Sequence, residues 1–169
     1  ERIPLNSFSI LDFAFHPKDT NKIFVGTKGG GLWKTEDGAN SWKKVQDKNG
    51  ILDAVAWVHK IAFSKSNPEE MYLAVFQKNR GRVLKSVDGG QSFQEVYFTP
   101  LEKFGVFDIF VDENGTVFIV TGQGGFFTSQ DHGKTWKIVR WFKDGLIKVA
   151  VNPNNSSIMY VFSPPGNIF

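Results

Sequence analysis

The chain contains no cysteine, only three histidines and only four arginines. Without cysteine it can form neither a disulfide nor a thiolate metal site, although this absence assigns no cellular compartment. The net charge of +3 is mild and no cluster of Lys and Arg stands out, so nucleic acid is not expected as a partner. No apolar run approaches the ~20 residues of a membrane-spanning helix, so no transmembrane segment is expected.

Apolar and aromatic residues are abundant instead: 41% of the 169 residues are hydrophobic, and 17 are Phe. This composition and length predict one folded domain with its own core. Its apolar runs recur, because segments 12–27, 60–75, 108–121 and 148–163 align with one another. The aligned residues Phe15, Phe63, Val111 and Val151 lie 48, 48 and 40 positions apart. A period in the forties is typical of propeller and solenoid repeats.

Each repeat contains four short strand-like runs, and no segment shows helical periodicity. Turns rich in Asn, Pro and Gly follow the first run, a Gly-rich connection follows the second, and an acidic turn follows the third. This pattern predicts an all-β fold of β-propeller blades with four antiparallel strands each. Within a single propeller region, 1–169, we expect blades at 10–46, 58–98 and 106–141, a partial blade at 146–169, and the outer strand of a preceding blade at 1–5.

The acidic turn is nearly the same in three repeats: "KTEDGANSW" at 34–42, "KSVDGGQSF" at 85–93 and "TSQDHGKTW" at 128–136. We call these stretches the aspartate turns. They resemble the Asp-box of BNR-repeat propellers, a group that includes photosystem-II assembly-factor-like, sortilin-like and xyloglucanase-like proteins. The first copy has Ala39 where the pattern has Gly. The matching residues are Thr35, Asp37, Ser41 and Trp42; Ser86, Asp88, Gly90, Ser92 and Phe93; and Ser129, Asp131, Gly133, Thr135 and Trp136.

We interpret the aspartate turns as structural joints. A short Asp side chain can accept hydrogen bonds from nearby backbone N–H groups, and Gly supplies the backbone freedom of a tight turn. The final Trp or Phe is expected to pack into apolar space at the outer edge of the blade. The resemblance implies that these turns join the third and fourth strands, on the face opposite the binding or active site.

The resemblance also bears on the size of the ring. A four-bladed ring could close if an N-terminal strand completed the last blade, which would remove free strand edges. In a second arrangement, the chain is an arc of a larger propeller whose other blades are supplied from outside this sequence. We favour this arrangement because members of the resembled group usually have six or more blades.

The face opposite the aspartate turns is the expected binding face. Aromatic rings beside cations can stack on sugars or hold acidic peptide segments, although ordinary loop decoration is an equally good interpretation. The candidate binding residues are Trp57, Lys78, Arg80, Arg82, Lys103, Phe104, Trp141 and Lys143, with Phe76, Phe98, Phe142 and Lys48 in the same connections.

The repeat also aligns four charged residues at the start of the first strands: Asp12, Lys60, Asp108 and Lys148. Because first strands surround the channel of a propeller, we expect these alternating charges to lie near one another at its mouth. A charge ladder that holds blades in register is a better interpretation than a ligand site.

Two functions remain open. The first is a non-enzymatic, extracytoplasmic scaffold that binds a protein or carbohydrate ligand. The second is a fragment of a sialidase-like or xyloglucanase-like glycoside hydrolase, whose catalytic residues lie partly outside this sequence. Arg2 fits the Arg-x-Pro segment of sialidases, but the repeat explains it as part of an outer strand. No catalytic residue, metal site or cofactor is assigned, since the histidines lack metal-ligand spacing and no pair of carboxylates stands out.

Overall fold

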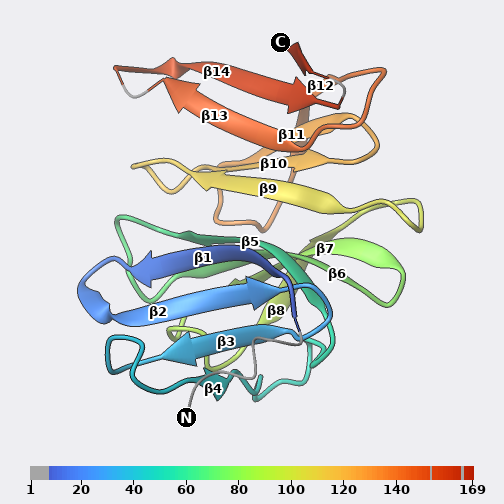
Figure 1. Ribbon diagram of the computed structural model, residues 1–169. Coiled ribbons are helices and arrows are strands. Elements are labelled where there is room, and N and C mark those ends of the chain that lie inside the picture. Colours follow the sequence, from blue (N-terminus) through green and yellow to red (C-terminus); the bar gives the residue numbers. More distant parts are fainter. Residues whose placement is uncertain (1–7, 153, 165) are drawn as a thin grey trace.

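The computed structural model describes residues 8–152, 154–164 and 166–169, and these residues form an all-β structure without a helix (Figure 1). Four antiparallel sheets are stacked in chain order, which confirms the predicted all-β fold and its four-stranded blades. The described residues contain no helix with the length and apolar character that crossing a membrane requires. The predicted outer strand at 1–5, and any role of Arg2, lie outside the described residues.

Three sheets have four strands and the last has three, each in sequence order. The first contains β1 (Ile10–His16), β2 (Asp19–Thr27), β3 (Leu32–Thr35) and β4 (Lys43–Lys44). The second contains β5 (Trp57–Phe63), β6 (Met71–Gln77), β7 (Arg80–Ser86) and β8 (Gln94–Phe98). The third contains β9 (Val106–Val111), β10 (Val117–Thr121), β11 (Gly125–Ser129) and β12 (Lys137–Trp141). The fourth contains β13 (Lys148–Asn152), β14 (Asn155–Ser163) and β15 (Asn167–Ile168).

The core lies between the sheets, in three clusters that each join one sheet to the next. Strand β6 shows how the sequence dictates this arrangement. Met71 and Leu73 pack in the cluster shared with the first sheet, whereas Tyr72 and Ala74 pack in the cluster shared with the third. A strand buried on both faces needs a continuous apolar run, which is what the stretch "MYLAV" provides.

The two ends of the sheets carry different connections. We call the end that carries the three aspartate turns the turn face, and the opposite end, where the second strands lead into the third, the loop face. In Figure 1 the turn face is on the left and the loop face on the right.

The connection that follows β6, in which Phe76, Arg80 and Arg82 were expected, is short. It is a two-residue turn, Lys78–Asn79, in which both residues have positive φ. Phe76 therefore belongs to β6, and Arg80 and Arg82 belong to β7, because a two-residue hairpin lets both strands continue to the turn.

A β-bulge recurs at the loop-face end of the first strands. The pairing register shifts between Ile10 and Asp12 in β1, between Val58 and Lys60 in β5, and beside Val106 and Asp108 in β9. One extra residue is thereby inserted just before each charged position of the repeat: Leu11, His59 and Phe107.

The outward faces of the first and last sheets carry exposed apolar side chains. Phe13 and Phe15 of β1 are 61% and 53% exposed, and Ile168 of β15 is 61% exposed. Equivalent faces between neighbouring sheets are buried, so these two surfaces have the character of unpaired blade faces.

Candidate functional site

The aspartate turns are closed by their own side chains. Oδ1 of Asp88 accepts the backbone N–H groups of Gln91 and Ser92 at 3.0 and 2.9 Å, and Oδ2 accepts the Ser92 hydroxyl at 2.6 Å. The Ser86 hydroxyl donates to Asp88 and accepts the N–H of Gly90 at 2.9 Å. The other two turns repeat this pattern around Asp37 and Asp131. Every polar atom of the carboxylate is used within the turn, which leaves little for a ligand.

Hydrogen bonds also hold these carboxylates ionised. The hydroxyl and N–H of Ser41 and the hydroxyl of Thr35 lower the pKa of Asp37 to about 2. Burial acts to raise the pKa of Asp88, but the hydrogen bonds from Ser92, Ser86 and Gln91 outweigh it and bring this pKa to about 2. The Thr135 hydroxyl and N–H likewise lower the pKa of Asp131.

The first turn keeps this geometry despite its alanine. Ala39 has φ of 74°, close to the 83° of Gly90 and the 88° of Gly133 at the same position. A residue with a Cβ rarely adopts this left-handed conformation, so the first turn carries backbone strain that the other two avoid.

The aromatic residue that ends an aspartate turn packs against the preceding sheet. Phe93 is 1% exposed and lies in the cluster between the first and second sheets. The indole Nε1 of Trp136 donates to the carbonyl of Val96, in the second sheet, at 2.8 Å. The turns therefore tie neighbouring sheets together, in addition to joining two strands.

A buried carboxylate adds a second tie on the turn face, between the second and third sheets. Glu70 accepts the Tyr72 hydroxyl at 2.7 Å, lies 3.2 Å from Nζ of Lys85, and lies 2.9 Å from Nδ1 of His132 in the third aspartate turn. Burial acts to raise the pKa of Glu70, but the hydrogen bonds from His132, Tyr72 and Lys85 outweigh it and lower the pKa below its ordinary value.

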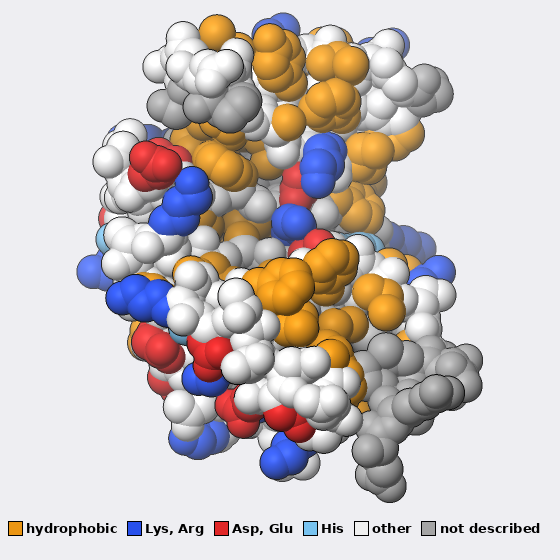
Figure 2. All heavy atoms as spheres, turned by 60° about the vertical axis from the view of Figure 1, so that its left-hand side comes forward, with side chains coloured by type: hydrophobic (Ala, Val, Ile, Leu, Met, Phe, Trp, Pro, Cys, Tyr) orange, Lys and Arg blue, Asp and Glu red, His pale blue; other side chains and the backbone are white. Residues whose placement is uncertain are grey.

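The four aligned charges lie in adjacent pairs along the first strands. Nζ of Lys60 is 3.2 Å from Asp12, and Nζ of Lys148 is 3.7 Å from Asp108. Each aspartate also accepts the N–H of the residue after the lysine, from Ile61 and Val149 at 2.8 and 3.0 Å. Figure 2 shows basic and acidic side chains alternating down the middle of the molecule.

Burial raises the pKa of Asp108, against the lowering effect of the Val149 N–H and of Lys148 and Lys60. Both aspartates thus bond to the backbone of the next sheet. This geometry suits a charge ladder that sets the register between blades.

On the loop face, the exposed indole of Trp57 forms the centre of a small cluster. Nζ of Lys28, from the neighbouring sheet, lies 4.6 Å from the ring centroid, and the rings of Phe76 and His59 lie at 6.1 and 6.2 Å. His59 in turn contacts the ring of Phe107 at 5.1 Å between centroids. Burial, and then the charge of Lys28, lowers the pKa of His59 and favours its neutral form. We call Lys28, Trp57, His59 and Phe107 the mouth cluster.

Trp57 and its neighbour Phe76 were among the residues expected on this face, whereas Lys28, His59 and Phe107 were not. The signal was available for His59 and Phe107, which stand one position before the aligned charges, 48 residues apart. Lys28 lies in the connection "KGG", where Gly29 comes close to the indole: a Cβ there would stand 3.7 Å from Nε1 of Trp57. Only the packing of the first sheet against the second shows this proximity.

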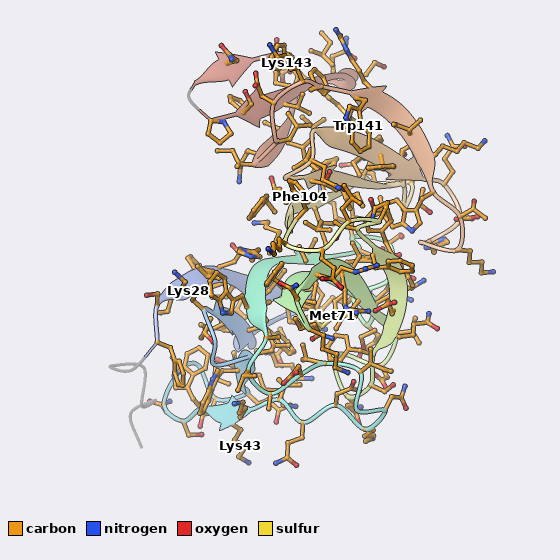
Figure 3. The ribbon with its side chains drawn as sticks, turned by 90° about the vertical axis from the view of Figure 1, so that its right-hand side faces the viewer. Lys28, Lys43, Met71, Phe104, Trp141 and Lys143 are labelled. Carbon is orange, nitrogen blue, oxygen red and sulfur yellow. The ribbon has the colours of Figure 1, made fainter. Side chains whose placement is uncertain are left out.

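The other candidate binding residues occupy separate places. Arg80 lies 3.8 Å from Glu102 and 5.5 Å from the Phe98 ring, and Arg82 bonds to Glu95, so both guanidinium groups are engaged within the second sheet and its connection. Figure 3 shows Phe104 between Lys28 and Trp141 on the loop face, with Lys143 beyond Trp141. Phe104, Trp141, Lys78, Lys103 and Lys143 are all exposed.

One aromatic and one basic residue that were expected on the loop face, Phe142 and Lys48, do not lie there. Phe142 is 7% exposed, because its ring packs in the cluster between the third and fourth sheets. Lys48 bonds through Nζ to Oε1 of Gln91, in the second aspartate turn, at 2.7 Å. The connection before β5 therefore runs along the outer rim before it reaches the loop face.

No protein-family model matches the chain. A curated relative, the oligoxyloglucan-reducing end-specific xyloglucanase of Emericella nidulans, is 23% identical over 177 aligned positions, which cover 91% of this chain and 21% of that protein. This chain therefore spans about a fifth of the length of that relative.

Solved structures show the same arrangement of sheets. The GH74 xyloglucanase from Xanthomonas campestris superposes with a TM-score of 0.68 and 17% identity, over 88% of this chain and 26% of the other. YCF48 from Cyanidioschyzon merolae superposes with a TM-score of 0.70 and 16% identity, over the whole chain and 55% of YCF48. A structure of YCF48 bound to a D1 peptide superposes with a TM-score of 0.69 and 19% identity, over 95% of this chain and 53% of the other. At this level of identity the comparisons establish the fold: the described residues form consecutive blades of a β-propeller.

Proposed function

We propose that this chain is an arc of a larger extracytoplasmic β-propeller that binds a protein or glycan ligand through its loop face and catalyses no reaction. The observation that carries the proposal is the mouth cluster, where an exposed indole lies beside a cation at 4.6 Å. An indole can stack on a sugar ring or an apolar side chain, and an ammonium can bind a carboxylate.

Two further observations support the proposal. The carboxylates of the aspartate turns already accept hydrogen bonds from the same turn, so these turns offer few polar atoms to a ligand on the turn face. The similar YCF48 structure holds a D1 peptide, which shows that a propeller of this fold can bind a peptide. The extracytoplasmic assignment is supported by the likeness to an extracellular domain of BT4673 from B. thetaiotaomicron.

The test is a screen of the chain against arrays of peptides and of cell-wall oligosaccharides, followed by titration of the tightest binder. The variant Lys28→Gln/Trp57→Ala is expected to lower affinity at least tenfold. The matched control, Lys134→Gln/Ile138→Ala, removes an exposed lysine and an exposed apolar side chain outside the loop face and is expected to change affinity less than twofold. Equal losses in both variants, or no binder on either array, would refute the proposal.

A second function, part of a glycoside hydrolase, is favoured by one observation: the curated relative is a xyloglucanase. Such enzymes use two carboxylates on either side of the scissile bond. Carboxylates in the loop-face connections include Asp53, Glu102 and Asp144, and Glu102 is already paired with Arg80. Release of reducing sugar from xyloglucan oligosaccharides that is lost in Asp53→Asn or Asp144→Asn would establish this function in place of the first.

A further inference from the structure

A basic groove runs along the outer rim between the first and second sheets. Its volume is about 510 Å³, and the second aspartate turn forms one wall through Gly90 and Gln91. Four lysines also line it: Lys34, Lys43, Lys44 and Lys48. The sequence alone shows no such cluster, because Lys34 belongs to β3 and becomes a neighbour of Lys43 only through the pairing of β3 with β4.

Contacts hold two of these lysines at the groove. Lys48 is fixed by two bonds to Gln91: Nζ donates to Oε1 at 2.7 Å, and the backbone N–H donates to the carbonyl at 3.0 Å. Nζ of Lys44 lies 5.9 Å from the ring of Trp33, its partner across the β3–β4 ladder. Lys43 is exposed, and Figure 3 shows it at the edge of the molecule, far from the loop-face residues.

The acidic side chains near the groove do not line it, so its lining is positively charged. Asp47 is the acid closest in sequence, but its carboxylate accepts four backbone N–H groups, at 2.6 to 3.0 Å, from residues 49, 51, 52 and 93. Glu36 pairs with Lys34 at 3.1 Å. No acidic side chain lines the groove itself, so the charges of Lys43, Lys44 and Lys48 face the solvent without an acidic partner among the described residues.

The fold does not require these lysines. The repeat places Gln94 and Glu95 of the second sheet at the positions of Lys43 and Lys44, opposite Lys85 and Leu84. There Glu95 bonds to Arg82 within its own sheet. The basic groove is therefore a property of one site on the molecule, unlike the aspartate turns.

We propose that this groove binds an extended acidic segment of a partner protein. Three lysines without an acidic partner among the described residues, next to Lys34, which is paired with Glu36, complement a run of Asp and Glu side chains. The groove also follows β4, a two-residue outermost strand that pairs, among the described residues, with β3 alone. An extended peptide can add to such an edge through its backbone, which a polysaccharide of equal charge cannot do. This site is separate from the loop face and does not depend on the function proposed there.

The probe is a fluorescein-labelled peptide of ten glutamates, titrated with the chain in 50 mM NaCl and followed by fluorescence anisotropy. The variant Lys43→Gln/Lys44→Gln/Lys48→Gln is expected to weaken binding about tenfold or more, since three charge pairs are lost. The control Lys18→Gln/Lys134→Gln/Lys137→Gln removes the same net charge from exposed lysines elsewhere and is expected to weaken it less than threefold. Circular dichroism and thermal unfolding check that both variants keep the fold.

Two further probes separate the proposal from its competitors. The same peptide methylated on alternate backbone nitrogens keeps its charge but cannot pair with a strand edge, and is expected to bind at least fivefold more weakly. Oligogalacturonate of ten residues is expected to bind more weakly than the peptide. Absence of peptide binding, equal losses in the two triple variants, equal binding of the methylated peptide, or preference for oligogalacturonate would each overturn the proposal.

Discussion

Replacing Glu70 by Gln removes the negative charge from the network between the second and third sheets. The side chain of Lys85 is 8% exposed and has Glu70, at 3.2 Å, as its counter-ion. Removing one partner of a buried pair leaves the other charge uncompensated and costs about 3–5 kcal/mol. Because the Gln oxygen can still accept a hydrogen bond, we expect a smaller loss than this, about 2–3 kcal/mol. At about 2–4 °C per kcal/mol for a chain of this size, the melting temperature should fall by about 4–12 °C.

The matched control is Glu70→Gln/Lys85→Met, which removes both charges and keeps an apolar side chain of similar length. Its free energy of unfolding should lie within about 1 kcal/mol of the wild-type value, as for other buried pairs replaced together. Urea unfolding at pH 7, followed by tryptophan fluorescence, measures all three proteins. A loss below about 1 kcal/mol in the single variant, or a double variant as unstable as the single one, would refute the assignment of this network as a tie between blades.

The same network predicts a pH dependence. The pKa of Glu70 is lowered in the folded chain, so its contribution is complete above the unfolded pKa of about 4.3 and is lost as pH falls through the folded value. The stability difference between wild type and Glu70→Gln should therefore shrink as pH falls below about 4. A difference that stays constant down to pH 2.5 would contradict this assignment.

Three substitutions in and beside the aspartate turns should change the free energy of unfolding in different directions. Ala39→Gly should stabilise by about 0.5–1 kcal/mol, because Gly adopts a φ of 74° without steric cost. Gly90→Ala should destabilise by about 2 kcal/mol, since its φ is 83° and the new Cβ would lie 3.1 Å from Cε1 of Phe24. Trp136→Phe should cost about 1 kcal/mol through loss of the hydrogen bond to Val96. Urea unfolding measures each, and a stabilising Gly90→Ala or a destabilising Ala39→Gly would contradict the turn geometry.

The features that the sequence predicted well are local or repeated. Strand periodicity and the aspartate turns depend on residues within a few positions of one another, and the 48-residue spacing brings Asp12 and Lys60 into register. Interactions between blades were harder to predict. His132 and Glu70 are 62 positions apart, and nothing in either local pattern indicates that a turn of one blade reaches the carboxylate of another.

The candidate site was predicted only in part, for a similar reason. Trp57 stood out as an aromatic residue near a long connection, but its contact with Lys28 depends on how two sheets pack. Arg80 was expected in the connection between the second and third strands of its repeat, whereas two residues with positive φ close the turn and leave the arginine in a strand. Backbone conformation at Lys78 and Asn79, which composition does not reveal, decided the outcome.

We have assigned recognition to the loop face and a structural role to the aspartate turns. The decisive experiment is titration of the tightest array binder against Trp57→Ala and Ser92→Ala, with thermal unfolding of both variants. We predict at least tenfold weaker binding and an unchanged melting temperature for Trp57→Ala, and nearly unchanged binding with a lower melting temperature for Ser92→Ala. Loss of binding in Ser92→Ala at a temperature where it is fully folded, with Trp57→Ala unaffected, would contradict the claim.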